Sequence, residues 1–198
     1  MDDHVREPIP DALKYEDGRY VPERFRRAGR TPSPRAARVF SRTLHAVHMP
    51  WFLLWLPAGV GVLTTTGRRS GKARHTPVKA ARAGDIAYVV SIGGAHALWY
   101  KNLRAQPAVR LQLTGGVFEG VARELRADEH PAAYAALCER VHPFDFVENA
   151  FHRRGRPTRD RVRELHRAWF DGGVVFAVDL GASAGRRRWP FSDRTPPG

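Results

Sequence analysis

The chain has 198 residues, 42% of them apolar, which is enough for one domain with a sizeable core. Its formal net charge is +13, but the 33 basic residues are 29 arginines and four lysines scattered along the whole chain. Without aromatic residues interleaved on a basic strand, this scatter does not indicate a nucleic-acid partner. The single cysteine, Cys138, excludes an internal disulfide and is typical of a reducing compartment, so we expect a cytoplasmic protein.

The N-terminal third has few strand signals. Residues 1–33 are rich in proline and charged side chains, which predicts a flexible arm. Ser33-Pro34 is a typical helix start, and Pro50 ends the helix that follows. Aromatic residues at 51–55 follow arginines, so segment 35–56 is a candidate for peripheral contact with the inner face of a membrane. Packing of these aromatics over one end of the core is the favoured interpretation.

From residue 60 the pattern changes to short strands with hairpin spacing. Six strands are expected, at 60–66, 74–82, 86–91, 108–113, 117–125 and 174–180. Helices are expected at 97–105, from the cap Asp128 to about 141, from Pro143 through 151, and from the cap Thr158 to about 170. No β-α-β series occurs, so we predict an α+β fold: an antiparallel β-barrel with peripheral helices over residues 34–180. Residues 181–198 are expected to form a disordered basic tail.

The loop after the first strand carries the strongest functional signal. Two glycines, a serine and four cations crowd into it: Gly67, Arg68, Arg69, Ser70, Gly71, Lys72 and Arg74. Glycine lets a backbone approach a ligand closely, and guanidinium groups bind oxyanions in two-pronged fashion. Only three residues separate the glycines, so this is not a Walker A loop. The loop predicts a site for a phosphorylated or carboxylated ligand; the alternative is a solvated hairpin turn.

Two further clusters are candidates. Ser91, Gly93 and Gly94 end a strand in a turn that can present a hydroxyl and N–H groups to a flat ligand, with Trp99 and Asn102 beyond it. Taken alone, Trp99 is favoured as a core residue, because it lies four residues from Leu103 on a helix. His142, Phe144 and Phe146 interrupt the later helices and could line a substrate pocket or pack in the core. No histidine or cysteine spacing predicts a metal site.

Taken in order, Leu63 to Gly71, Arg74, Pro77, Gly84-Asp85, Ser91, Gly93-Gly94, Trp99-Tyr100 and Asn102-Leu103 resemble the deazaflavin-dependent nitroreductase and quinone reductase family. The resemblance covers about residues 35–130. It implies an actinobacterial oxidoreductase of the split β-barrel fold, which is flavin-reductase-like and FMN-binding-like. The cofactor it implies is coenzyme F-420. The reaction it implies is hydride transfer from the reduced deazaflavin to a quinone, a nitroaromatic or a similar conjugated small molecule.

The same resemblance implies residue roles. The 67–74 loop would hold the phosphate and glutamyl tail of the coenzyme, and Pro77, Val78 and Lys79 would pass along its ring. Ser91, a candidate catalytic residue, would bond the ring edge together with Gly93 and Gly94. Trp99 and Asn102 would close the far side.

Two departures from the family pattern leave alternatives open. Ile92 stands where many relatives carry a lysine, and the tyrosines that shape the acceptor pocket are absent around residues 142–148. The acceptor therefore stays open, and a non-catalytic carrier of a lipid, fatty acid or haem-like ligand remains an alternative function. FMN remains an alternative cofactor because it too is flat, conjugated and phosphorylated. The sequence does not predict an oligomeric state.

Overall fold

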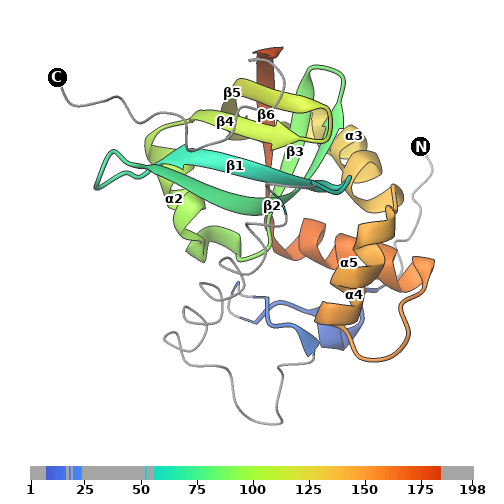
Figure 1. The fold of residues 1–198 in the computed structure, drawn as a ribbon. Coiled ribbons are helices and arrows are strands. Elements are labelled where there is room, and N and C mark those ends of the chain that lie inside the picture. Colours follow the sequence, from blue (N-terminus) through green and yellow to red (C-terminus); the bar gives the residue numbers. More distant parts are fainter. Residues whose placement is uncertain (1–7, 17, 19, 24–51, 53–55, 184–198) are drawn as a thin grey trace, which may run out of the picture.

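The computed structural model describes residues 8–16, 18, 20–23, 52 and 56–183, and all structural statements below concern these residues. Six antiparallel strands form a closed barrel in the order β1-β2-β3-β6-β5-β4 (Figure 1). The strands are β1 (Val60–Thr66), β2 (Ala73–Ala83), β3 (Ile86–Ser91), β4 (Ala108–Leu113), β5 (Gly116–Glu124) and β6 (Val174–Ser183). The expected α+β barrel with peripheral helices is confirmed.

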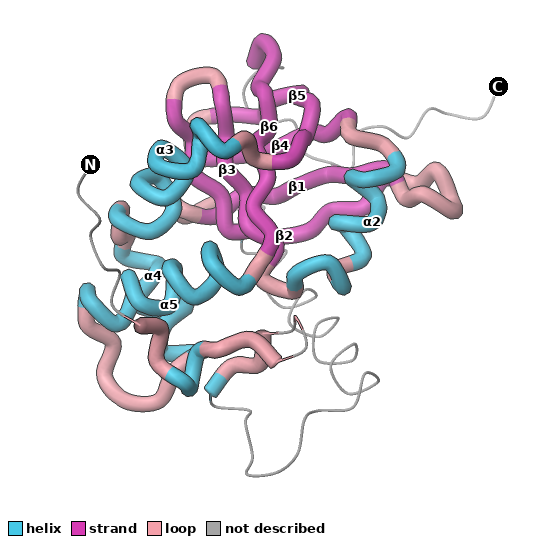
Figure 2. Tube along the Cα trace, turned by 180° about the vertical axis from the view of Figure 1, so that it is seen from behind, coloured by secondary structure: helices cyan, strands magenta, loops and turns pink. Residues whose placement is uncertain are grey.

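Four α-helices surround the barrel: α2 (Leu98–Ala105), α3 (His130–Tyr134), α4 (Pro143–His152) and α5 (Arg159–Gly172). Short 3-10 turns lie at Asp11–Leu13, Gly94–His96 and Ala127–Glu129, and a π-helical turn lies at Ala135–Glu139. Figures 1 and 2 show α2 on one side of the barrel, while α3, α4 and α5 gather on the other.

The alternation of side chains along the strands divides the core into two layers. Val89 points into the barrel, where it packs with Leu111 and Phe176. Its neighbour Tyr88 points outward, into a second layer beneath the helices that includes Trp169. Successive strand residues face opposite sides of a sheet, so β3 serves both layers and is buried on both faces. Cys138 lies in the outer layer and is buried.

One of the two expected helix caps is correct. The Thr158 side chain accepts a hydrogen bond from the Arg161 N–H (3.3 Å), as predicted for the start of α5. Asp128 is not a cap. The Glu129 carboxylate instead reaches back to the Arg126 N–H (3.1 Å), so the helical run starts at Ala127. The carboxylate at the third helical position thus makes the reciprocal hydrogen bond of a capping box, while Asp128 lies inside the run.

The chain ends differ from the sequence expectation where they are described. Leu13 is fully buried, so described residues of the expected arm pack on the domain. At the other end, β6 runs to Ser183, three residues beyond the expected limit. The Ser33-Pro34 helix start lies outside the described residues, as does most of segment 35–56. Within that segment Phe52 and Leu56 are described and buried. No helix in the described ranges is long and apolar enough to cross a membrane.

Candidate functional site

The loop between β1 and β2 is a tight turn whose four cations have no acidic partner in the part of the chain that the structure describes. The Gly71 N–H donates to the Gly67 carbonyl (2.8 Å), and the Gly67 N–H donates to the Lys72 carbonyl (2.9 Å). Gly71 has a φ of 64°, which favours glycine. The cationic side chains are all exposed, and no acidic group of the described chain lies within 4.0 Å of any of them: Arg68, Arg69, Lys72 and Arg74. Their charge is available to an external anion.

Helix α2 fixes this loop through Asn102. The Asn102 Oδ1 accepts from the Arg68 N–H (3.3 Å), and its Nδ2 donates to the Thr65 Oγ1 (3.3 Å). Asn102 is buried, so water does not compete strongly for either contact. The amide therefore ties the start of the loop to the end of β1. The resemblance assigned Asn102 to the cofactor site, but nothing in the sequence predicted these two hydrogen bonds.

The first half of β2 has an open edge. Pairing with β3 begins only at Lys79, opposite Val90, whereas β1 pairs with β2 from Ala73 onward. The Ala80 N–H donates to the Gly59 carbonyl (3.1 Å), on the side of β1. Because the backbone groups of successive strand residues point to opposite sides, the even-numbered residues of this part of β2 bond toward β1 and the odd-numbered residues point away from it. Pro77 therefore directs its backbone to the side where no described strand pairs with it. A proline suits such an edge because it has no N–H to satisfy.

The turn from Ser91 to Gly94 stands where that edge opens. By register, Ser91 would come next to Val78, just beyond the last β2–β3 pair. The Ser91 side chain is fully buried, and its hydroxyl donates to the Gly94 carbonyl (2.9 Å). Gly94 has a φ of 58°, and Gly93 is exposed. The hydroxyl hydrogen is thus used within the turn, and the exposed backbone of Gly93 is the part of the turn that a ligand can reach.

Two side chains that the resemblance places along the coenzyme pack into the barrel. Val78 is 6% exposed and belongs to the interior cluster, so only its backbone lies at the edge. Trp99 is half-buried, and its ring centroid lies 6.1 Å from that of Phe176. Pro77, by contrast, is partly exposed on the outer face of β2.

Lys79, on the same face as Pro77, is part of a buried charge cluster. Its ammonium bonds to the Asp145 carboxylate and lies 3.3 Å from Glu148 Oε2. Lys79 is 5% exposed and Asp145 is fully buried. Burial lowers the pKa of Lys79, but the carboxylates of Glu148 and Asp145 outweigh it and raise the pKa. Lys79 is therefore a charged, internally paired residue.

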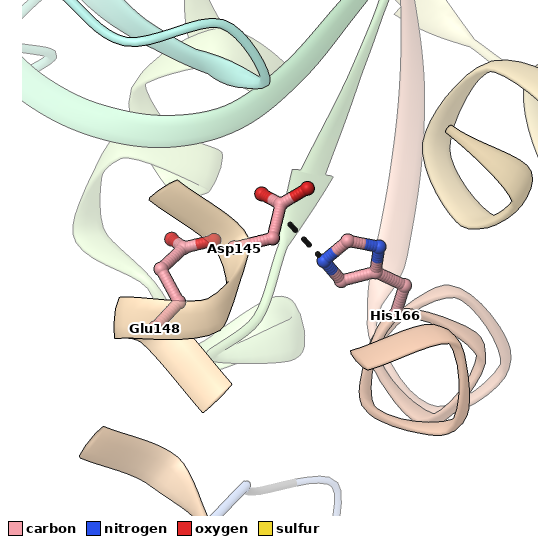
Figure 3. A group of neighbouring side chains, drawn as sticks. All are labelled: Asp145, Glu148 and His166. Atoms are coloured by element: carbon pink, nitrogen blue, oxygen red, sulfur yellow. Dashed lines mark ion pairs between the residues drawn. The ribbon is translucent and has the colours of Figure 1, made fainter. Parts of the chain in front are cut away.

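His166 completes this cluster. Its Nε2 lies 3.9 Å from Asp145 Oδ1 (Figure 3), and neither ring nitrogen has a hydrogen-bond partner among the described residues. Burial lowers the pKa of His166 to about 3, and the positive charge of Lys79 acts in the same direction. The imidazole is therefore neutral at pH 7.

The ligand-type atoms of Asp145, Glu148 and His166 lie within 4.8 Å of one another, close enough to hold a metal ion (Figure 3). The Lys79 ammonium already bonds to both carboxylates, and a divalent cation would have to displace it against its charge. We therefore infer that the Lys79 ammonium, and not a metal ion, neutralises the carboxylates of this cluster. The pairing could not be predicted from the sequence, because Asp145 and Glu148 lie 66 and 69 residues from Lys79.

The three expected substrate residues lie at the start of α4, beside this cluster. The His142 N–H donates to Asp145 Oδ2 (2.7 Å), which caps the helix. The Phe144 ring packs edge-on against Phe52, with centroids 5.8 Å apart. Phe146 is half-buried. The His142 backbone is therefore engaged in capping the helix, and the Phe144 ring is engaged in packing.

A barrel that places free cations, an open strand edge and a glycine turn together has the features needed to bind a flat, anionic cofactor. A sequence profile of the family described as F-420H(2)-dependent quinone reductase matches residues 47–149, which are 103 of the 198 residues. The chain belongs to this family, so it is an F-420-dependent reductase, and its cofactor is coenzyme F-420.

Solved structures with similar folds include proteins of this kind. One, described as an F-420-H2 dependent reductase, is 25% identical over 61% of this chain and 93% of its own, with a TM-score of 0.40. A second, described as an F-420 reductase, is 18% identical over 64% of this chain and 89% of its own, with a TM-score of 0.38. A third, described as a domain-swapped dimer, is 22% identical over 72% of this chain and 97% of its own, with a TM-score of 0.42.

The residues present fit this coenzyme. Its phosphate and carboxylates need cations, and the 67–74 loop offers four that are not paired within the described chain. Its flat ring needs a surface with free backbone groups, and the β2 edge at Pro77 offers one. Arg74 and Pro77 are three residues apart on one strand, a span of about 10 Å at 3.3 Å per residue. An extended ligand that is anionic at one end matches that span.

Proposed function

We propose that this reductase passes a hydride from reduced F-420 to a quinone, a nitroaromatic or a similar conjugated acceptor. Membership of the family supports the coenzyme and the reaction class. The observation that carries the proposal is a set of exposed loop cations that have no acidic partner among the described residues, beside a strand edge with which no described strand pairs. Charges left unpaired in this way are typical of a binding site rather than of a surface stabilised by ion pairs.

The proposed roles follow the geometry of β2. Arg68, Arg69, Lys72 and Arg74 hold the phosphate and glutamyl tail. The backbone at Pro77 and the turn at Gly93 and Gly94 line the ring, and the buried Ser91 hydroxyl holds that turn in shape through its bond to the Gly94 carbonyl. The coenzyme, when bound, supplies the hydride chemistry. The protein orients the two reactants and excludes water from between them.

A fluorescence titration tests coenzyme binding. We expect micromolar protein to quench F-420 fluorescence, and Arg69→Ala and Arg74→Ala to weaken binding about 10- to 100-fold each, the value of a lost charge-assisted hydrogen bond. Arg163→Ala is the matched control, because it removes the same charge from an exposed site on α5. Absence of quenching by the wild type would contradict the proposal. A parallel titration with FMN measures selectivity between the two cofactors.

A non-catalytic carrier is the second candidate. It is favoured by the segment expected to form the acceptor pocket, where Phe144 packs on Phe52 and the His142 backbone caps α4. Oxidation of F-420H2 in the presence of a naphthoquinone or a nitroaromatic separates the two functions. Turnover with either acceptor supports the reductase. A copurified lipid or haem identified by mass spectrometry, without turnover, supports the carrier.

A further inference from the structure

The N-terminal segment packs directly on the turn that we assign to the coenzyme site. The Tyr15 hydroxyl donates to the carbonyl of Ile92 (2.9 Å), the residue that follows Ser91, across 77 positions of sequence. The backbones meet as well, because a Cβ on Gly94 would lie only 2.7 Å from the Gly18 carbonyl oxygen. The turn is thus held from outside by residues far away in the chain.

The Tyr15 ring packs against two glycines, and the absence of their side chains leaves space for it. A Cβ on Gly172, at the end of α5, would lie 2.3 Å from Tyr15 Cδ2. A Cβ on Gly173 would lie 3.3 Å from the Tyr15 hydroxyl and 2.8 Å from the Ser91 carbonyl oxygen. The two glycines therefore leave room for an aromatic ring between α5 and the turn.

Further contacts hold this part of the arm in place. Leu13 is fully buried in the outer core layer, and the Tyr20 ring lies 5.6 Å from that of Tyr15 and 6.0 Å from that of Trp169. Burial raises the pKa of Tyr15, so its hydroxyl keeps the proton that it donates to Ile92. The contact is therefore present throughout the physiological pH range.

We propose that Tyr15 is a positioning residue for the coenzyme: by holding the Ile92 carbonyl, it fixes the shape of the Ser91–Gly94 turn. A turn with two glycines loses more conformational entropy than other turns when a ligand orders it. An external contact that orders the turn beforehand removes that cost from binding. This inference rests on the proposed site, and it gives the arm a role in coenzyme affinity that the family resemblance does not contain.

Tyr15→Phe tests the inference because it removes only the hydroxyl. We expect the dissociation constant for F-420 to rise about fivefold, within the range for one neutral hydrogen bond. The KM for F-420H2 should rise similarly, while the KM for the acceptor stays unchanged. Tyr20→Phe is the matched control, because it removes a hydroxyl from the same segment and should leave the F-420 dissociation constant at its wild-type value.

Gly172→Ala provides an independent perturbation, because its Cβ would displace the Tyr15 ring without altering Tyr15. We expect it to weaken F-420 binding at least as much as Tyr15→Phe, and the double variant to be no weaker than Gly172→Ala alone. Hydrogen–deuterium exchange of a peptide covering residues 91–97 should quicken in both single variants without coenzyme.

The outcomes separate this inference from the proposed function. Wild-type affinity in Tyr15→Phe and Gly172→Ala, with wild-type protein that binds F-420, would overturn the role of Tyr15. Equal weakening by Tyr20→Phe would overturn it too, because docking of the whole arm would then explain the effect. Wild-type protein that does not bind F-420 would refute the proposed function and the coenzyme role of Tyr15 with it. In that case exchange at 91–97 still shows whether Tyr15 orders the turn.

Discussion

Replacing Lys79 with methionine should strongly destabilise the fold. Methionine keeps much of the side-chain length but removes the ammonium that bonds to Asp145 and Glu148. Asp145 is fully buried and the Glu148 side chain is only 19% exposed, so water cannot replace the lost partner at Asp145. Removing one member of a buried ion pair costs about 3–5 kcal/mol, because an uncompensated charge remains.

Urea unfolding at pH 7 measures this cost. A lower midpoint with an unchanged slope would report a change in stability alone. In a thermal scan the same loss corresponds to a fall of about 6–20 °C, at about 2–4 °C per kcal/mol for a chain of this size. Lys101→Met is the control, because Lys101 is exposed on α2, and it should change stability by less than about 0.5 kcal/mol.

A compensated variant tests the reason for the loss. Combining Lys79→Met with Asp145→Asn and Glu148→Gln leaves no bare carboxylate in the cluster, and asparagine keeps an oxygen for the His142 N–H. This triple variant should recover most of the stability, since neutral replacements of buried ion pairs are often tolerated. The reasoning fails if Lys79→Met costs less than about 1 kcal/mol, or if the triple variant is as unstable as the single one.

Three other changes probe different parts of the molecule. Asn102→Ala removes both hydrogen bonds that tie the loop to β1, and should weaken F-420 binding about 3- to 10-fold in a fluorescence titration. The pKa of His166 is about 3 in the folded state and about 6.5 in the unfolded state, so acidification below pH 6.5 protonates His166 only in the unfolded state. The wild type should therefore lose up to about 1.4 kcal/mol of unfolding free energy per pH unit through this residue. Urea titrations at pH 4–7 should show that His166→Phe lacks this part of the pH dependence. Gly120→Ala places a Cβ 2.7 Å from the Asp179 carbonyl oxygen, where the β5–β6 register shifts, and should cost about 1–3 kcal/mol in the same assay.

The strands could be predicted because their signals are local. Five of the six lie within one residue of the expected limits, since alternating apolar residues and glycine turns such as Gly84 (φ 63°) mark them directly. The prediction was wrong where the outcome depends on which of two adjacent carboxylates makes the hydrogen bond, or on pairing with a distant strand. Glu129 rather than Asp128 caps the helical run, and pairing with β5 extends β6 as far as Ser183.

The candidate site likewise has a part that could be predicted from the sequence and a part that could not. The 67–74 loop could be read from its composition, because glycine and arginine act within a few residues of one another. The contacts of Lys79 with Asp145 and of Tyr15 with Ile92 bridge 66 and 77 residues, and no periodicity or spacing rule connects such pairs. They depend on how α4 and the N-terminal segment pack against the barrel, which is a property of the tertiary structure.

Arg74 and Lys79 of β2 use positive charge in opposite ways, and this explains how one strand can serve both the fold and the site. At its start, Arg74 is exposed and has no acidic partner in the described chain, so its charge is available to a ligand. Near its middle, the charge of Lys79 is neutralised by carboxylates from α4 and adds little long-range attraction. In the proposed binding mode, the anionic end of the coenzyme is drawn to the loop, and its ring extends along the strand toward Pro77 and the turn that Tyr15 holds.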